Sequence, residues 1–275
     1  MSDSYTDFAQ VYDELMDETP YELWKERIVG AIEEFGISKP IKNVEDIPEG
    51  AEVSEEELLE SERNLVVDLG CGTGTLTEML YAEGYDMIGI DMSDAMLEKA
   101  MDKKAESGSE ILYLCQDMRE LELYSTVGTV ISVCDSINYL TEEDDVSLTL
   151  GLIHNYLYPG GLFIFDFNTD YKYREVIGDT TIAENREDCS FIWENFYDPD
   201  EKINEYDLTI FVEEKGGLFR KFSETHFQKG YDKQQMEEML IAAGFEIVKM
   251  IDSDTENEAD DESERIFVIA RCIKD

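Results

Sequence analysis

The sequence of 275 residues predicts an α/β protein built on a doubly wound, mostly parallel sheet of seven strands, with an antiparallel β insertion forming a cap. Residues 65–168 alternate short apolar runs with helical patterns, as expected for βα units of a parallel sheet. The turn of the first unit carries glycine at every second position. Residues 170–229 break the alternation and show extended segments between turn signals, which predicts antiparallel strands.

The glycine-rich turn belongs to the sequence LVVDLGCGTGTLTEML at residues 65–80. Its first residues form a short apolar run, typical of a strand buried on both faces of a parallel sheet. Gly70, Gly72 and Gly74 follow, and without a Cβ they let the backbone approach a ligand closely. A helix predicted over 75–82 would offer free N–H groups to a carboxylate or phosphate. The turn therefore predicts a site for a nucleoside that carries a charged tail.

Two cofactor classes use such a turn, and the glycine spacing separates them. A dinucleotide fingerprint reads G-x-G-x-x-G, whereas here the third glycine falls one place early, at Gly74, and Thr75 takes its position. With Asp68 in front, the segment VVDLGCGTG resembles the first motif of the class I S-adenosylmethionine-dependent methyltransferases. The resemblance implies a Rossmann-like sheet whose last strand is antiparallel, S-adenosyl-L-methionine as cofactor, and cofactor contacts from Asp68, Gly70, Gly72 and Gly74. A nicotinamide dehydrogenase and a turn without a ligand are the less favoured alternatives.

A second apolar strand, predicted over 87–90, ends at Asp91. Its distance from the glycine turn is the one at which an acidic residue receives the ribose hydroxyls, and a carboxylate can accept both hydrogen bonds. Asp91 and its neighbour Met92 are therefore predicted cofactor-binding residues, with a plain strand-end acid as the alternative for Asp91. Ser93 is the predicted N-cap of the next helix.

A third strand, predicted over 111–115, is followed by Asp117 and Met118. In the resembled family an acid at this place contacts the adenine amino group and the next residue packs on the ring. The resemblance therefore implies these two cofactor contacts for Asp117 and Met118. A polar strand end before a loop is the alternative.

The fourth strand, predicted over 127–133, leads into a loop that contains Cys134 and Tyr139. The resemblance places this loop beside the methionine part of the cofactor, so that Cys134 packs against the cofactor and Tyr139 lines the acceptor pocket. Acidic residues also follow the carboxyl ends of several predicted strands. Ligands of such sheets bind at that edge, so these residues indicate the same binding site. They are Asp68, Asp91, Asp117 and Asp135.

The rest of the core follows the same pattern. A helix is predicted over 142–156, a turn over 159–161 and a fifth strand over 162–167, with two final strands over 245–251 and 266–272. The predicted domain organisation is an N-terminal helical lid (1–37), an acidic linker (38–64), a methyltransferase core (65–169 and 230–275) and an inserted antiparallel cap (170–229).

The N-terminal segment is predicted to form two helices. Its sequence YTDFAQVYDELM resembles the start of a YqeM-like group of bacterial small-molecule methyltransferases, in which this segment closes over the cofactor. The resemblance makes Tyr5 and Tyr12 candidates for lid contacts, with plain packing as the alternative. Two acidic stretches, 38–64 and 252–264, are expected to be solvated, mobile connections.

Composition restricts the partners. The formal net charge of −44 disfavours nucleic acid, whose binding depends on Lys and Arg, and no apolar run is long enough to span a membrane. The five cysteines occur singly, with no C-x-x-C pair, which predicts no structural metal site and a reduced compartment. The start of the sequence lacks a signal-peptide pattern, so a cytoplasmic location is expected. A monomer or a homodimer is expected.

Methyl transfer from a sulfonium is an in-line displacement that needs alignment, exclusion of water and sometimes a base. His226 is the candidate base and Tyr139 a candidate pocket residue. The predicted function is transfer of a methyl group to a small-molecule N, O or S nucleophile. An RNA or protein methyltransferase of the same fold and a non-catalytic S-adenosylmethionine-binding protein remain alternatives.

Overall fold

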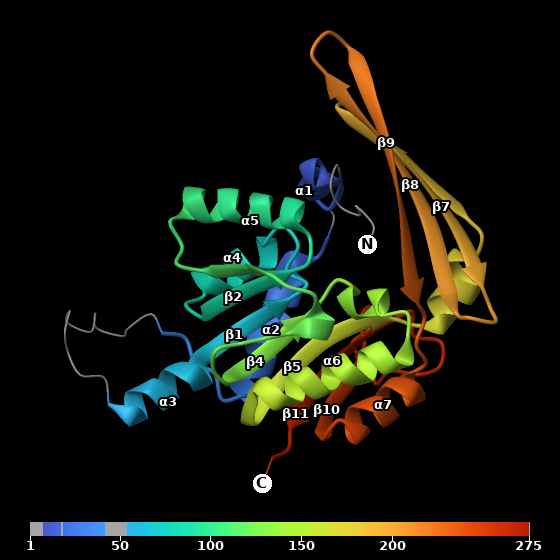
Figure 1. Cartoon of the computed structure of the whole chain (residues 1–275). Helices are drawn as coiled ribbons and strands as arrows, with labels where there is room; N and C mark the ends of the chain where they lie inside the picture. The colour runs from blue at the N-terminus through green and yellow to red at the C-terminus, as the bar shows by residue number, and fades with distance from the viewer. Residues whose placement is uncertain (1–7, 18, 42–53, 275) are drawn as a thin grey trace.

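The computed structural model describes residues 8–17, 19–41 and 54–274 (Figure 1). Seven strands form one sheet in the order β10-β11-β5-β4-β1-β2-β3, and β11 runs antiparallel to both neighbours. The predicted fold class is therefore confirmed, with the last strand antiparallel. The strands of this sheet are β1 (Leu65–Leu69), β2 (Asp86–Asp91), β3 (Leu112–Cys115), β4 (Val127–Ser132), β5 (Leu157–Asn168), β10 (Phe245–Asp252) and β11 (Arg265–Cys272).

Helices cover both faces of the sheet. On one face α2 (Tyr21–Phe35) and α4 (Thr75–Ala82) pack against the strands, and α5 (Asp94–Ser107) lies beside α4. On the other face lie α6 (Glu143–Tyr156) and α7 (Lys233–Ala242). Ser93 is the N-cap of α5, as predicted, because its hydroxyl accepts the Met96 N–H. No helix in the described part of the chain is long and apolar enough to cross a bilayer.

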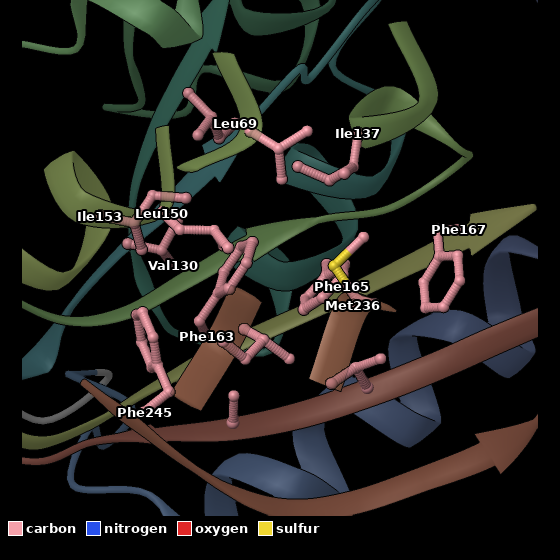
Figure 2. Close-up of a cluster of buried hydrophobic side chains, with 14 of the residues drawn as sticks. Leu69, Val130, Ile137, Leu150, Ile153, Phe163, Phe165, Phe167, Met236 and Phe245 are labelled. Carbon is pink, nitrogen blue, oxygen red and sulfur yellow. The ribbon is translucent and has the colours of Figure 1, made fainter. Parts of the chain in front are cut away.

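The core on the α6 and α7 face is aromatic along β5. Phe163, Phe165 and Phe167 are fully buried and point to one side of the strand, where they meet α6, α7 and β10 (Figure 2). The rings of Phe163 and Phe165 stack with centroids 4.4 Å apart. This core supports the carboxyl ends of the main strands, where the sequence predicts the binding site.

The fifth strand differs from the prediction. The predicted turn at 159–161 lies inside β5, which begins at Leu157. Val127 pairs with Leu157 but Thr129 pairs with Leu162, so the extra residues bulge out of the pairing. Gly160 takes a φ of 80° in this bulge. The turn signal was real, but the strand resumes its pairing with β4 after it.

Both acidic stretches contain structure that the prediction missed. Residues 55–64 form α3 (Glu55–Asn64), which starts with a capping box between Ser54 and Glu57; residues 42–53 lie outside the described part. The second stretch, 252–264, is largely exposed as expected, but it is folded into turns. Asp252 Oδ1 accepts the Asp254 and Thr255 N–H groups, and the buried Ser263 carbonyl accepts a hydrogen bond from Thr169 Oγ1 at 2.6 Å. Short polar side chains close local turns here.

The insertion is a separate antiparallel sheet that extends away from the main sheet (Figure 1). Its strands are β6 (Thr181–Asn185), β7 (Cys189–Asp198), β8 (Ile203–Glu214) and β9 (Leu218–Lys229). One face carries Leu208 and Ile210, which pack with Val11 of the N-terminal segment. The insertion and the N-terminal segment therefore meet over the carboxyl ends of the main strands.

Candidate active site

Two adjoining cavities lie at the carboxyl ends of β1 and β4, where the strand order of the sheet reverses. This is the usual ligand position in open α/β sheets. The cavities share four lining residues, namely Tyr12, Trp24, Cys134 and Tyr139. Below, the cavity beside the glycine-rich turn is called the turn cavity, and the one beneath the insertion is called the cap cavity.

The glycines of the turn have different roles. Gly70 and Gly72 line the turn cavity, with φ values of 83° and 54°. A Cβ on Gly72 would meet no atom within 4 Å, so the backbone there is open to a ligand. Gly74 does not line the cavity: it is the left-handed N-cap of α4, and a Cβ there would lie 2.5 Å from the Tyr113 hydroxyl. Its direct contact with a cofactor stays a prediction, but its need for glycine is local packing.

Asp68 lies at the bottom of the turn cavity. It is 2% exposed, and its Oδ2 accepts a hydrogen bond of 2.6 Å from Thr77 Oγ1. Burial raises the pKa of the Asp68 carboxyl to about 7. A cation in this cavity would favour its ionised form.

Asp91 closes the same cavity at the end of β2. Its two oxygens accept the N–H groups of Gly72 at 2.9 Å and Ser93 at 2.8 Å, and burial raises its pKa. Each oxygen keeps a second lone pair for a ligand. Met92 and Met118 also line this cavity, and Met92 is 60% exposed at its rim. Two polarisable side chains beside an opening suit a flat aromatic ligand.

Asp117 is engaged in an ion pair and is not among the residues that line the turn cavity. Its carboxylate is held by Arg119 at 2.6 Å, and this hydrogen bond lowers the Asp117 pKa. Arg119 also pairs with Asp145, at 3.1 Å. Met118, the neighbour of Asp117, does line this cavity. A contact between Asp117 and adenine would require this pair to open, and it stays a prediction.

The N-terminal segment covers the turn cavity. Asp13 in α1 (Tyr12–Leu15) accepts a hydrogen bond of 2.6 Å from Thr73 Oγ1 and pairs with Lys103 of α5 at 2.7 Å. The Tyr12 hydroxyl lies 4.0 Å from Cys134 Sγ. Tyr5 lies outside the described residues. The segment is thus tied to the glycine-rich turn on one side and to the insertion on the other.

The loop after β4 joins the cavities. Cys134 and Asp135 have φ values of 63° and 52°, a left-handed conformation that costs roughly 1 to 2 kcal/mol per non-glycine residue. Buried charges hold it: the Asp135 N–H donates to Asp166 at 2.8 Å, and Arg265 pairs with Asp135 at 2.6 Å and Asp166 at 2.9 Å. Burial raises the pKa of the Cys134 thiol to about 12. Cys134 is therefore a neutral packing group at the junction.

The cap cavity has a volume of about 560 Å³ and aromatic walls. The walls come from the N-terminal segment, from α2, from the loop after β4 and from the inner face of the insertion. Their aromatic members are Phe8, Tyr12, Trp24, Tyr139, Phe191, Trp193 and Tyr206. The polar end holds Arg27, Asp135, Asp254 and Arg265. Both arginines already have carboxylate partners, Glu256 for Arg27 and Asp135 with Asp166 for Arg265.

His226 lies in the wall of the cap cavity and is 3% exposed. Its Nδ1 is 3.4 Å from the Tyr139 hydroxyl, which is 2.7 Å from the Tyr206 hydroxyl. Its Nε2 is 3.5 Å from Glu224 Oε2. The other histidine, His154, lies outside both cavities, with Nε2 3.1 Å from the Ile273 carbonyl oxygen.

The structure brings most predicted site residues together, and their roles as ligands or base stay predictions. It also adds residues that sequence reasoning missed: Asp13, Trp24, Tyr206, Glu224 and Arg265. Only Glu224 could have been predicted from the sequence. It lies two residues before His226 in a predicted strand, and residues two apart in a strand share a face. Among the described residues no cluster of three His, Cys, Asp or Glu side chains could hold a metal.

Comparisons with known proteins agree with this geometry. Residues 66–161 match a family model described as a methyltransferase domain. The chain is 34% identical over 271 residues to YqeM of Bacillus subtilis (strain 168), covering 98% of both chains; that protein is named as a methyltransferase with no acceptor specified. A solved S-adenosylmethionine-dependent methyltransferase from Clostridium acetobutylicum ATCC 824 superposes with a TM-score of 0.78 at 25% identity, covering 98% of this chain and 99% of the other.

A more distant relative has a named acceptor. The dTDP-3-amino-3,4,6-trideoxy-alpha-D-glucopyranose N,N-dimethyltransferase of Streptomyces venezuelae is 24% identical over 190 residues, covering 68% of this chain and 77% of the other. The near-full-length match to YqeM, together with the fold, is decisive for the family. The chain belongs to the class I S-adenosylmethionine-dependent methyltransferases and, within them, to the YqeM-like group.

Proposed function

We propose that this methyltransferase transfers a methyl group to a nucleophilic N, O or S atom of a small molecule bound in the cap cavity. The observation that carries the proposal is the cap cavity itself. It adjoins the turn cavity, it is walled by aromatic side chains from four separate segments, and its volume of about 560 Å³ suits a small molecule. A polymer acceptor would need an open groove instead.

The turn cavity fits S-adenosyl-L-methionine. Buried carboxylates of Asp68 and Asp91 complement a ligand that carries an ammonium and a sulfonium. We propose that Asp91 binds the ribose hydroxyls and that Met92 and Met118 contact the adenine. The cofactor would come closest to the backbone at Gly72. When bound, this cofactor supplies an electrophilic methyl carbon.

The chain's own residues position the acceptor and exclude competing nucleophiles. Tyr12 and Cys134 stand at the junction of the cavities, and burial raises the pKa of the Tyr12 phenol and of the Cys134 thiol. Both groups therefore stay protonated at neutral pH and are poor nucleophiles. The aromatic walls keep water from the reacting atoms.

An amine is the favoured acceptor among the three nucleophiles. The two arginines of the cap cavity are matched by carboxylates, and Asp254 adds negative charge at the polar end. A ligand with a cationic group is therefore better matched than an anion. The amino-sugar N,N-dimethyltransferase among the relatives is consistent with this choice. The net charge of −44 argues against nucleic acid.

The five cysteines are all unpaired thiols, which fits work in the reducing cytoplasm. We propose a monomer or a homodimer there, which size-exclusion chromatography with light scattering can check.

A two-stage experiment tests the function. Titration calorimetry should first show that the protein binds S-adenosyl-L-methionine and not NAD. A coupled assay for S-adenosylhomocysteine should then give turnover with members of a library of small amines, alcohols and thiols. Turnover with RNA or protein alone, or cofactor binding without turnover on any of these substrates, would contradict the proposal.

A further inference from the structure

A buried carboxylate lies behind the histidine of the cap cavity. Glu224 and His226 are two residues apart in β9, so their side chains share the inner face of the insertion. The side chain of Glu224 is 7% exposed and that of His226 is 1% exposed. Glu224 Oε2 lies 3.5 Å from His226 Nε2, and Glu224 Oε1 accepts the Phe8 N–H at 3.1 Å. One oxygen of this carboxylate is thus held by a backbone hydrogen bond, and the other faces the imidazole.

The imidazole ring is held between aromatic neighbours. Tyr206 stacks on it with ring centroids 5.0 Å apart and an interplanar angle of 18°. The rings of Phe8 and Tyr139 meet it edge-on. Stacked and edge-on contacts fix the plane of the ring, so one nitrogen faces Glu224 and the other faces Tyr139.

Tyr139 connects this pair to the reacting atoms. It lines both cavities, so it lies at the junction where a bound acceptor would meet the cofactor. Tyr206 lies 2.7 Å from that hydroxyl, and burial raises the Tyr206 pKa well above its usual value. A phenol that keeps its proton donates to the Tyr139 oxygen and leaves the Tyr139 proton to point at His226 Nδ1, 3.4 Å away.

We propose that Tyr139, His226 and Glu224 form a proton relay that removes a proton from the acceptor, an inference that rests on the proposed function. Tyr139 and His226 carry the proton, and Glu224 is a positioning residue. It holds the imidazole with its proton on Nε2, which leaves the lone pair of Nδ1 for the proton that arrives from Tyr139. Contacts of this length shorten when a substrate binds.

The relay accounts for every bond and proton of the methyl transfer. The lone pair of the acceptor atom forms the new bond to the methyl carbon, and the electrons of the broken carbon–sulfur bond stay on sulfur. The proton of the acceptor passes to the Tyr139 oxygen as the phenol proton passes to His226 Nδ1. The imidazolium charge that results is balanced by Glu224, and the proton leaves to water when the product departs.

The tautomer of His226 tests the relay without knowledge of the acceptor. Long-range proton–nitrogen NMR spectra of the histidine rings at pH 8 should show His226 with its proton on Nε2. The chain has two histidines, so a His154→Gln variant assigns the signals. A proton on Nδ1 of His226 would overturn the relay, because Nδ1 could not then accept.

The contribution of the Glu224 charge to turnover can be tested after an acceptor has been identified. Glu224→Gln keeps the size of the side chain and an oxygen for the Phe8 N–H, but it removes the charge and places an NH2 donor opposite His226 Nε2. We expect kcat to fall about 10- to 100-fold, less than the roughly 100- to 10,000-fold contribution of a complete acid–base group. The acceptor KM and the cofactor Kd should change less than about twofold. Glu194→Gln, the same change on the exposed outer face of β7, is the matched control and should leave kcat unchanged.

Equal kcat for Glu224→Gln and the wild type would overturn the relay while leaving the proposed function intact. A wild-type protein without turnover on any small acceptor would instead contradict the proposed function, and the tautomer measurement would still decide whether the buried triad is set up to accept a proton.

Discussion

The turn cavity and the cap cavity are built in opposite ways. The turn cavity is made chiefly of strand ends and a turn that lie close together in the chain, with Asp68, Gly70, Gly72 and Asp91 within 24 residues. The cap cavity is assembled from the N-terminal segment, α2, the loop after β4, the insertion and β11. Local sequence can encode the first, whereas only the folded chain creates the second. The proposed donor site is therefore readable as a motif, and the proposed acceptor site is not.

The largest expected effect concerns the charges that join the two cavities. Arg265→Met would leave Asp135 and the fully buried Asp166 without their cation, which should cost about 3 to 5 kcal/mol of folding free energy. Chemical denaturation measures this loss. Arg271 lies on the same strand as Arg265 and makes only an exposed pair with Glu246 of β10, so Arg271→Met should cost less than about 1 kcal/mol. Similar losses for both variants would contradict a special role for the buried network.

Removal of the Asp91 carboxylate should affect only the turn cavity. Asp91→Ala loses the acceptor of two backbone N–H groups and, on our proposal, of the ribose hydroxyls. The Kd for S-adenosyl-L-methionine should therefore rise about 100-fold or more, since bonds to charged groups contribute about 1.5 to 3 kcal/mol each. Calorimetry measures this change, with Asp102→Asn on the exposed side of α5 as control. An unaltered Kd would refute the ribose assignment.

The cap cavity should respond in the opposite sense. Trp193→Ala removes an aromatic wall that does not touch the turn cavity, so the acceptor KM should rise roughly tenfold while the cofactor Kd stays constant. Steady-state kinetics and calorimetry separate the two quantities. Phe196→Ala, on the outer face of the same strand and 51% exposed, should change neither. A rise in the cofactor Kd for Trp193→Ala would show that the cavities are not independent.

The smallest effect is the pH dependence of cofactor binding. Because the Asp68 pKa is raised to about 7, the carboxyl is mostly protonated at pH 6 and mostly ionised at pH 8. Only the ionised form attracts a cation, so affinity for S-adenosyl-L-methionine should fall up to about tenfold from pH 8 to pH 6. Calorimetry in buffers of different ionisation enthalpy should detect proton release on binding at pH 6. In Asp68→Asn both effects should vanish; if they persist, another group is responsible.

The sequence predicted the main sheet and the strand-end acids because these depend on short-range pattern. It missed the continuation of β5 through its bulge, since pairing with β4 overrides the turn signal of Pro159, Gly160 and Gly161. It also missed Arg265, whose partner Asp166 lies 99 residues earlier, and Asp13, which meets Thr73 60 residues later. Such pairs leave no local pattern, and they form only when distant segments pack.

The central claim is that donor and acceptor occupy two adjoining cavities. A crystal structure with S-adenosylhomocysteine tests it most directly. We expect the nucleoside in the turn cavity, with its ribose hydroxyls on Asp91, its adenine at Met118 and its sulfur facing the cap cavity at Tyr139. Density for the ligand in the cap cavity, or a ribose placed away from Asp91, would contradict the account.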